Sequence, residues 1–501
     1  MPMHNHHADV AVWAELVRVL ARFGLGAASS AFGSQRFGVR ERPFGSTPFG
    51  VRQPFGAAMP VLTTPRVYGA AAVAAAAACL RCKSKALQLA GASLLALVPL
   101  YAALAPEVAP GVTDPRGDDP DDGANVFAAV LDSLPSLEGK CVCVTGATSG
   151  LGLQVARAAV LKRAALLICV NRDSPRSALA WDRLDELSES VGGATAVHTV
   201  DAEFLSLESV KAAAGDVAAL APGGVDVLAC NAGLFSGADA RSRDGYDATA
   251  QVSVLAHVLL TKLLLPSLKV AAAARGEARV VQHHSGQRNN KNNGAYDPER
   301  YLGRSPPGAL GGDAPGGRFA RYGQAKLSQA VFAMELHRRL GDHGKVKSLS
   351  AEPGLAKTSL GATFLASFPW WNPLPLLLPF AFPLARAQPA SHGVVPLLRA
   401  CFDAEAESGD LWMPASWVTA GDDPTALAAK ARPLRAVAAG VADADAQAAA
   451  VRGDDEVAGD APTLDPAHGA RLWAATDRVL VDLGVGRFLV RACRDTYAGT
   501  K

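Results

Sequence analysis

The sequence is poor in aromatic and charged residues for its length. Aromatic side chains make up 6% and charged side chains 19% of the 501 residues, whereas 49% are hydrophobic. The formal net charge is only +2, so no excess of positive charge indicates a nucleic-acid partner. Because domains commonly run to about 100–200 residues and sometimes to about 250, this apolar content suits one large α/β domain with extensions.

The eight cysteines do not have the spacing of a disulfide framework or of a zinc site. Four of them lie inside apolar, strand-like runs: Cys141, Cys143, Cys169 and Cys230. A free cysteine in such a run behaves as a small buried hydrophobe. Cys79 and Cys82 form a CxxC pair without a second pair at zinc spacing. We therefore expect reduced thiols and no metal site.

Residues 1–66 differ in composition from the rest of the chain. Phe-Gly pairs alternate with Arg, Ser and Pro, which cannot easily build a core, so we expect a largely disordered N-terminal extension. The segment is rich in arginine and poor in acids, and residues 10–23 have an amphipathic helical pattern. These features are typical of an organelle presequence. We expect an organelle or membrane-associated protein, in a plastid, a mitochondrion or the endoplasmic reticulum.

Residues 67–106 contain two apolar runs. The second run, 86–106, carries no charge and approaches the length of about 20 residues that spans a bilayer. A basic flank precedes it, of the kind found beside membrane anchors. A membrane anchor and a buried or presequence helix are both open, since Pro99 and several alanines weaken the pattern. Residues 107–135 are acidic and proline-containing, and we predict a linker there.

From about residue 136 to residue 420, strand-like apolar runs alternate with helix-like runs. This alternation predicts an α/β fold, a doubly wound parallel sheet of the Rossmann type with helices on both faces. Residues 421–465 are rich in Ala, Asp and Gly, and we predict a surface insertion. Residues 466–501 contain a final amphipathic helical pattern at 472–483.

A glycine-rich turn joins the predicted first strand, 141–145, to a predicted helix, 151–163. The residues assigned to this site are Thr145, Gly146, Ser149, Gly150, Leu151 and Gly152. Glycines here allow a tight turn, close approach of the backbone to a pyrophosphate, and close packing of helix on strand. The phosphates would lie at the helix N-terminus, where free N–H groups favour anions. The pattern predicts a dinucleotide-binding site.

The choice of dinucleotide depends on the end of the predicted second strand, 165–170. This strand runs into Asn171-Arg172-Asp173, about 20 residues after the glycines, where a Rossmann fold binds the adenosine ribose. An acidic residue there binds the 2′-OH of NAD, and an arginine accommodates the 2′-phosphate of NADP. Arg172 favours NADP, and Asp173 leaves NAD open.

The motifs together resemble the short-chain dehydrogenase/reductase family. They occur in the family's order: TGxxxGxG at 145–152, an adenine-contacting acid at Asp201, NNAG at Asn231, Ala232 and Gly233, YxxxK at Tyr322 and Lys326, and PGxxxT at Pro353, Gly354 and Thr358. The resemblance implies that these residues bind the cofactor. Within the family, segments 259–266 and 322–328 resemble the retinol dehydrogenase-like group, which has WW-domain oxidoreductases as neighbours.

The resemblance also implies a catalytic set of Ser285, Tyr322 and Lys326. Ser285 ends a segment similar to the family's RIVNVSS and would orient the substrate oxygen. Tyr322 and Lys326 are four residues apart and so share a helix face. We expect the ammonium of Lys326 to lower the pKa of the Tyr322 phenol, which would exchange a proton with the substrate oxygen. Lys326 would also hold the nicotinamide ribose.

Five positions depart from the family pattern, and the first of them is Cys230, which replaces the first asparagine of NNAG. Ser253 stands where the family has an asparagine that supports a proton relay, and we include it in the catalytic set. A serine is shorter and offers one donor instead of two. His283 and His284 replace small or apolar residues, and Glu352 replaces a histidine.

The predicted substrate side is very apolar. Residues 368–384 combine Trp, Leu and Phe with prolines, which suits a pocket for a lipophilic molecule, contact with a membrane face, or ordinary core packing. We predict an NADP(H)-dependent oxidoreductase that interconverts a lipophilic alcohol and carbonyl, retinoid-, lipid- or pigment-like. A non-catalytic dinucleotide-binding scaffold and a protochlorophyllide-type reductase are the alternatives. The sequence does not determine substrate identity, reaction direction or oligomeric state.

Overall fold

The computed structural model describes residues 126–234, 239–341, 345–354, 356, 389–414, 431–433, 463 and 465–484. Several predictions fall outside these residues: the presequence-like segment 1–66, the apolar segment 67–106, the linker up to residue 125, most of the insertion 421–465, the apolar segment 368–384 and Thr358.

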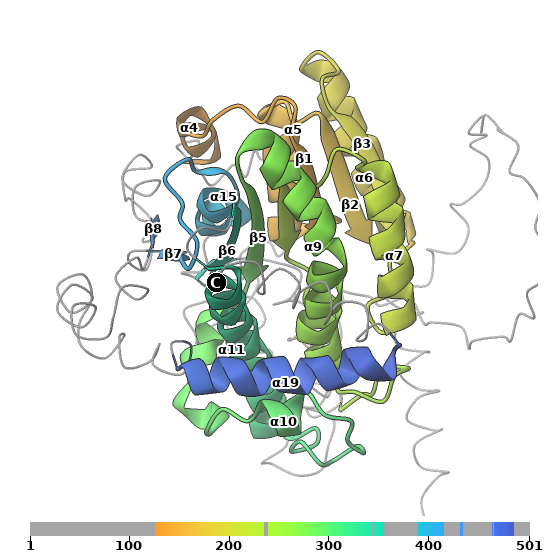
Figure 1. Cartoon of the computed structure of the whole chain (residues 1–501), viewed down its shortest axis with the longest axis vertical. Coiled ribbons are helices and arrows are strands. Elements are labelled where there is room, and N and C mark those ends of the chain that lie inside the picture. Colours follow the sequence, from red (N-terminus) through yellow and green to blue (C-terminus); the bar gives the residue numbers. More distant parts are fainter. Residues whose placement is uncertain are drawn as a thin grey trace, which may run out of the picture. The chain divides into compact units, whose positions relative to one another are not determined.

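An eight-stranded sheet lies at the centre of the described residues (Figure 1). Its strands are β1 (Cys141–Thr145), β2 (Leu166–Asn171), β3 (Ala196–Asp201), β4 (Val227–Cys230), β5 (Ala278–His283), β6 (Val346–Ala351), β7 (Leu411–Pro414) and β8 (Ala431–Pro433). They are arranged in the order β3-β2-β1-β4-β5-β6-β7-β8. Strands β1 to β7 pair in parallel, and β8 is antiparallel to β7.

The strand order reverses between β1 and β4, because the chain first builds outward to β3 and then crosses back. This reversal is the switch point at which doubly wound folds bind ligands. The predicted fold class is therefore confirmed. The short strand β8 lies within the segment predicted to be an insertion and extends the sheet by one antiparallel edge.

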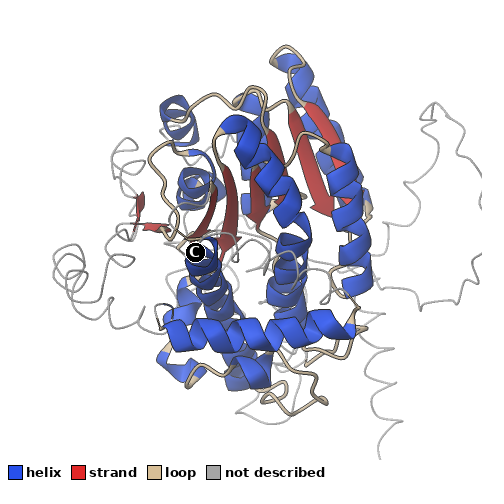
Figure 2. Cartoon of the chain, in the orientation of Figure 1, coloured by secondary structure: helices blue, strands red, loops and turns tan. Residues whose placement is uncertain are grey.

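Helices cover both faces of the sheet (Figure 2). One face carries α4 (Val126–Ser133), α5 (Gly150–Leu161), α6 (Pro175–Ser190), α14 (Ala390–Gly393) and α15 (Val395–Phe402). The other carries α7 (Leu207–Leu220), α9 (Ala256–Arg275) and α11 (Pro315–Leu340). Shorter elements are α8 (Ala248–Ala250), the π-helical η3 (Gln251–Leu255), η4 (Gly286–Asn289), η5 (Lys291–Asn293) and α10 (Pro298–Tyr301).

Strand alternation divides the core into two apolar layers. In β1, Val142 and Val144 pack on the α5 side, whereas Cys141 and Cys143 pack on the α9 side, as expected for a sheet buried on both faces. The four cysteines predicted to be buried thiols are buried and free. Helix α4 lies within the segment predicted to be a linker, but its side chains pack into the α5-side layer.

One helical run in the described part of the chain, 248–275, is long and apolar enough to cross a membrane. Most of its apolar window is buried inside the protein, and α9 packs against α7 and the sheet. Core packing therefore accounts for its apolar composition.

The predicted final helix is α19 (Pro466–Asp482), which packs across α11 (Figure 1). Trp473 stacks on Phe332 of α11 with ring centroids 6.1 Å apart. Lys262 Nζ of α9 lies 3.9 Å from the Trp473 ring centroid and pairs with Asp477 at 2.6 Å. Through these contacts α19 supports the helix that carries Tyr322.

Candidate active site

The glycine turn between β1 and α5 has no room for a side chain at Gly146 or at Gly152. Gly146 and Gly150 have φ angles of +69° and +57°, a region that glycine adopts without steric cost. A Cβ atom on Gly146 would lie 2.9 Å from Ala232 Cα, and one on Gly152 would collide with the Asn231 amide. Ser149 at the N-cap of α5 makes no side-chain capping hydrogen bond. The turn thus offers close backbone approach and free helical N–H groups, as a pyrophosphate requires.

The hydroxyl of Thr145 is fully occupied by protein groups. It accepts hydrogen bonds from the main-chain N–H groups of Asn231 and Ala232, both at 2.9 Å. His257 Nε2 lies 2.9 Å away, and His257 Nδ1 lies 2.9 Å from the Ser253 carbonyl. Because a carbonyl only accepts, Nδ1 carries the proton and Nε2 accepts from Thr145. Burial lowers the pKa of His257 to about 4. The Thr145 hydroxyl therefore joins the end of β1 to the turn after β4, which contains Asn231 and Ala232.

Asn231 connects the glycine turn to the end of β5. Its Nδ2 donates to the carbonyls of Thr145, at 3.0 Å, and Gly146, at 3.2 Å. Its Oδ1 lies 2.9 Å from His283 Nδ1. The amide side chain predicted to bind cofactor thus joins the glycine turn to the end of β5, and Gly233 beside it is exposed.

The three predicted catalytic residues lie together. Ser285 follows β5, is half-buried, and accepts from the Gln287 main-chain N–H at 3.3 Å. Its side chain is hydrogen-bonded to Tyr322. Tyr322 and Lys326 are buried on α11, with Lys326 Nζ 5.7 Å from the Tyr322 ring centroid. Lys326 also donates to the main-chain carbonyl of His283 at 3.1 Å.

The pKa values of this pair differ from the sequence prediction. Burial raises the pKa of Tyr322 to about 12, against the opposing effect of the Ser285 hydrogen bond. Burial lowers the pKa of Lys326 to about 7. The expectation that Lys326 lowers the Tyr322 pKa was wrong for this structure, because desolvation of the phenolate dominates. Burial therefore favours the protonated form of the Tyr322 phenol.

Ser253 lies in the π-helical turn η3, where π-helical geometry is often found at functional sites. Its side chain is buried, and its hydroxyl has no hydrogen-bond partner among the described residues. Its carbonyl accepts from His257. In the structure, Ser253 thus contacts the site through its main chain.

The predicted adenosine end lies at the carboxyl ends of β2 and β3. Arg172 is exposed and lies 3.9 Å from the Glu203 carboxylate. Asp201 accepts from the Asp173 main-chain N–H at 2.7 Å. Asn171 Oδ1 accepts from the Ala147 N–H at 2.8 Å and ties this edge to the glycine turn. Arg172 is accessible to a phosphate, and Asp201 orders the loop after β2.

The predicted nicotinamide end follows β6 at Pro353 and Gly354; Thr358 is outside the described residues. The preceding Glu352 is buried and pairs with buried Arg288. His284 Nδ1 lies 3.7 Å from the same carboxylate. The ion pair between Arg288 and Glu352 joins the segment after Ser285 to the turn that begins at Pro353. Sequence reasoning noted Glu352 as a departure but missed Arg288, which belongs to no motif.

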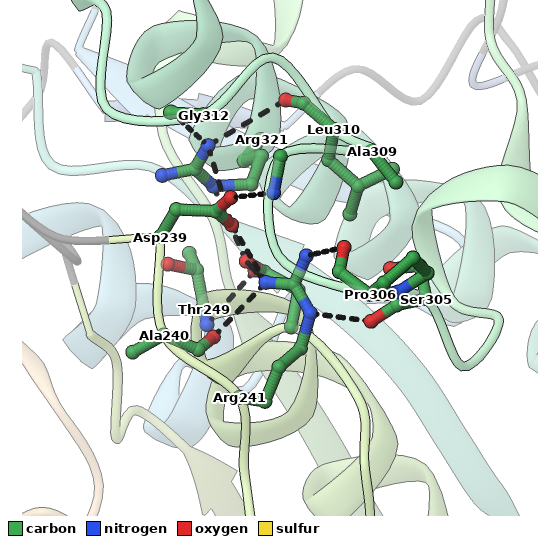
Figure 3. Close-up of polar contacts among 12 residues, drawn as sticks. Asp239, Ala240, Arg241, Thr249, Ser305, Pro306, Ala309, Leu310, Gly312 and Arg321 are labelled. Atoms are coloured by element: carbon green, nitrogen blue, oxygen red, sulfur yellow. Dashed lines mark hydrogen bonds and ion pairs between the residues drawn. The ribbon is translucent and has the colours of Figure 1, made fainter.

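A second buried ion-pair network was also missed (Figure 3). Arg321 Nε lies 3.2 Å from Asp247 Oδ2, and Arg321 donates to the Gly312 carbonyl at 2.6 Å. Arg241 pairs with Asp239 at 2.6 Å and donates to the Pro306 carbonyl at 2.6 Å. The network fixes the loop 303–313 against the segment before α8. Because Arg321 directly precedes Tyr322, it also anchors the helix that carries this phenol.

Comparisons with known proteins identify sequences similar to this chain. The short chain dehydrogenase family model matches residues 140–297. A short-chain dehydrogenase/reductase of Armillaria gallica is 30% identical over 231 residues, covering 46% of this chain and 69% of the relative. Mouse polyprenol dehydrogenase is 32% identical over 228 residues, covering 45% of this chain and 63% of the relative.

Human retinol dehydrogenase 13 is 30% identical over 243 residues, covering 47% of this chain and 65% of the relative. The chain thus spans less than two thirds of the length of the two named dehydrogenases. The region that the family model matches, 140–297, contains the glycine turn, the turn after β4 and Ser285.

Proposed function

The chain belongs to the short-chain dehydrogenase/reductase family, in its retinol dehydrogenase-like group, and we propose that it is an NADP(H)-dependent oxidoreductase that interconverts a lipophilic alcohol and carbonyl. The observation that carries the proposal is the hydrogen bond between Ser285 and Tyr322, with Lys326 beside them. The names of the polyprenol and retinol relatives support a long apolar substrate.

The chain's own residues supply the proton chemistry of this reaction. A bound reduced nicotinamide supplies the hydride that converts a carbonyl carbon to the alcohol level. The half-buried hydroxyl of Ser285 orients the substrate oxygen. Tyr322, protonated at neutral pH because burial raises its pKa to about 12, donates its proton to that oxygen. Lys326, whose pKa burial lowers to about 7, stabilises the phenolate when its amine is protonated. In the reverse direction, the phenolate removes the alcohol proton.

Arg172 supports NADP(H) over NAD(H). Its exposed guanidinium stands at the end of β2, where a Rossmann fold binds the adenosine ribose. A guanidinium forms charge-assisted, bidentate hydrogen bonds with phosphate oxygens. The neighbouring Glu203 opposes an additional anion, so the preference is expected to be moderate.

The test is NADPH consumption by the full-length protein with a long-chain aldehyde and with a short, water-soluble aldehyde. We expect a higher kcat/KM with the long-chain aldehyde, because an apolar pocket gains binding energy with each buried methylene. Equal values for the two aldehydes would contradict a lipophilic substrate. Absence of turnover in both directions, in a folded sample that binds NADPH, would contradict the oxidoreductase.

A non-catalytic dinucleotide-binding scaffold is the second candidate. The observation that favours it is Ser253, whose hydroxyl has no hydrogen-bond partner in the described part of the chain, at the position where the family has a relay asparagine. A scaffold would bind NADPH but would show the same background rate as the Tyr322→Phe variant. A rate well above that of the variant excludes it.

A further inference from the structure

His283 lies between three parts of the proposed site. Its ring contacts Asn231 in the turn after β4, with Nδ1 2.9 Å from Oδ1. Its main-chain carbonyl accepts from Lys326 Nζ at 3.1 Å. Ser285 follows two residues later in the chain. Yet the family pattern has a small or apolar residue at this position, so the imidazole requires its own explanation.

The surrounding hydrogen bonds determine which ring nitrogen carries the proton. Asn231 Nδ2 faces two carbonyls, those of Thr145 and Gly146, so Oδ1 must face His283. Since Oδ1 only accepts, His283 Nδ1 is the donor and Nε2 is a bare acceptor. Burial, reinforced by the nearby Lys326 and His257, lowers the pKa of His283 to about 3 and keeps the ring neutral.

The Nε2 atom of His283 is buried and has no hydrogen-bond partner among the residues that the structure describes. His283 as a whole is more than nine-tenths buried, with 8% of the residue exposed. Leaving a buried acceptor unsatisfied costs about 1–3 kcal/mol. A ligand that brings a donor to this atom would remove that cost.

We propose that His283 is a further cofactor-binding residue, whose Nε2 accepts a hydrogen bond from a hydroxyl of the nicotinamide ribose. This inference rests on the proposed function. The ribose is the expected donor because the resemblance assigns that sugar to Lys326, which is bonded to the His283 carbonyl. Asn231 holds the imidazole in the orientation and tautomer that the contact requires.

The test compares dissociation constants, measured by calorimetry on the full-length protein, for NADPH and for adenosine 2′,5′-bisphosphate, which lacks the nicotinamide half. His283→Asn keeps a donor in place of Nδ1 but removes the far acceptor. We expect it to weaken NADPH binding about three- to tenfold, the effect of one hydrogen bond, and to leave bisphosphate binding unchanged. His283→Gln, which retains a far acceptor, should lose less.

Unchanged NADPH binding by His283→Asn would overturn the inference and leave the proposed function standing. Equal weakening of both ligands would also overturn it, since His283 would then act only through the fold of the turn around Asn231. If His283→Asn does not fold, His283→Val provides the same comparison with an apolar side chain of the kind found in the family. Failure of the wild type to bind NADPH would overturn the proposed function itself.

Discussion

The hydroxyl of Thr145 donates to Nε2 of His257 across 2.9 Å, in a direction fixed by the Ser253 carbonyl on the other side of the ring. This bond locks β1 to the helix that begins at η3 and requires a neutral imidazole. Protonation of His257 Nε2 would place its N–H donor opposite the Thr145 hydroxyl, which is also a donor. We therefore expect the structure around the glycine turn to lose this hydrogen bond as pH falls.

Acidification should destabilise the protein through His257. Its pKa is about 4 in the fold, below its ordinary value of 6.5, so the unfolded chain binds the proton first as pH falls. The stabilisation is complete above pH 6.5 and is lost between pH 6.5 and 4, by about 3 kcal/mol for a shift of this size. His283 acts in the same direction. Urea unfolding at pH 7 and pH 4.5 measures the loss.

The matched variants are His257→Gln and, as a control on the surface of β3, His198→Gln. We expect the first to flatten the dependence of the unfolding free energy on pH and the second to leave it as in the wild type. An equally steep dependence in His257→Gln would contradict the assignment.

Tyr322→Phe should lower kcat by about 10²–10⁴-fold, the range for loss of a general acid, with little change in NADPH affinity. The control is Tyr296→Phe, because that buried phenol bonds Ser328 at 3.1 Å away from the catalytic set. It should cost about 1 kcal/mol of stability and retain kcat. Steady-state kinetics and thermal unfolding separate the two effects, and an active Tyr322→Phe enzyme would refute the mechanism.

Gly152→Ala should abolish dinucleotide binding and lower stability, because the added methyl group collides with the Asn231 amide and the Gly146 carbonyl. Gly215→Ala is the matched change on α7, where a Cβ meets nothing within 4 Å. It should raise stability by about 0.5–1 kcal/mol and keep NADPH binding. Calorimetric titration of both variants with NADPH separates steric blockage of the binding turn from the effect of replacing any helical glycine. Normal NADPH binding by Gly152→Ala would contradict the close packing around Gly152.

Ser253→Ala should leave the unfolding free energy unchanged or raise it by up to about 1 kcal/mol, because the wild-type hydroxyl is buried without a partner in the described residues. Chemical denaturation measures this difference. A loss of more than about 1 kcal/mol would show that the hydroxyl has a bonding role.

The local elements of the site could be predicted from the sequence. The glycine turn, the strand before it and the Tyr322/Lys326 spacing are each encoded within a few residues, and the structure places them together. The direction of the Tyr322 pKa shift could not be predicted, because it depends on burial by distant elements rather than on the four-residue spacing. Two contacts of the site join residues far apart in the sequence: Asn231 and His283 are 52 positions apart, and Arg288 and Glu352 are 64 positions apart. The periodicity of the sequence does not predict contacts at such separations.

A fluorescence titration of the full-length protein with NADPH and NADH tests whether the β1–α5 turn and Arg172 bind NADP(H). We predict tighter binding of NADPH, and a loss of about tenfold in NADPH affinity in Arg172→Ala, the value of one charge-assisted hydrogen bond, with NADH affinity unchanged. Binding of neither nucleotide by the folded wild-type protein would contradict the account.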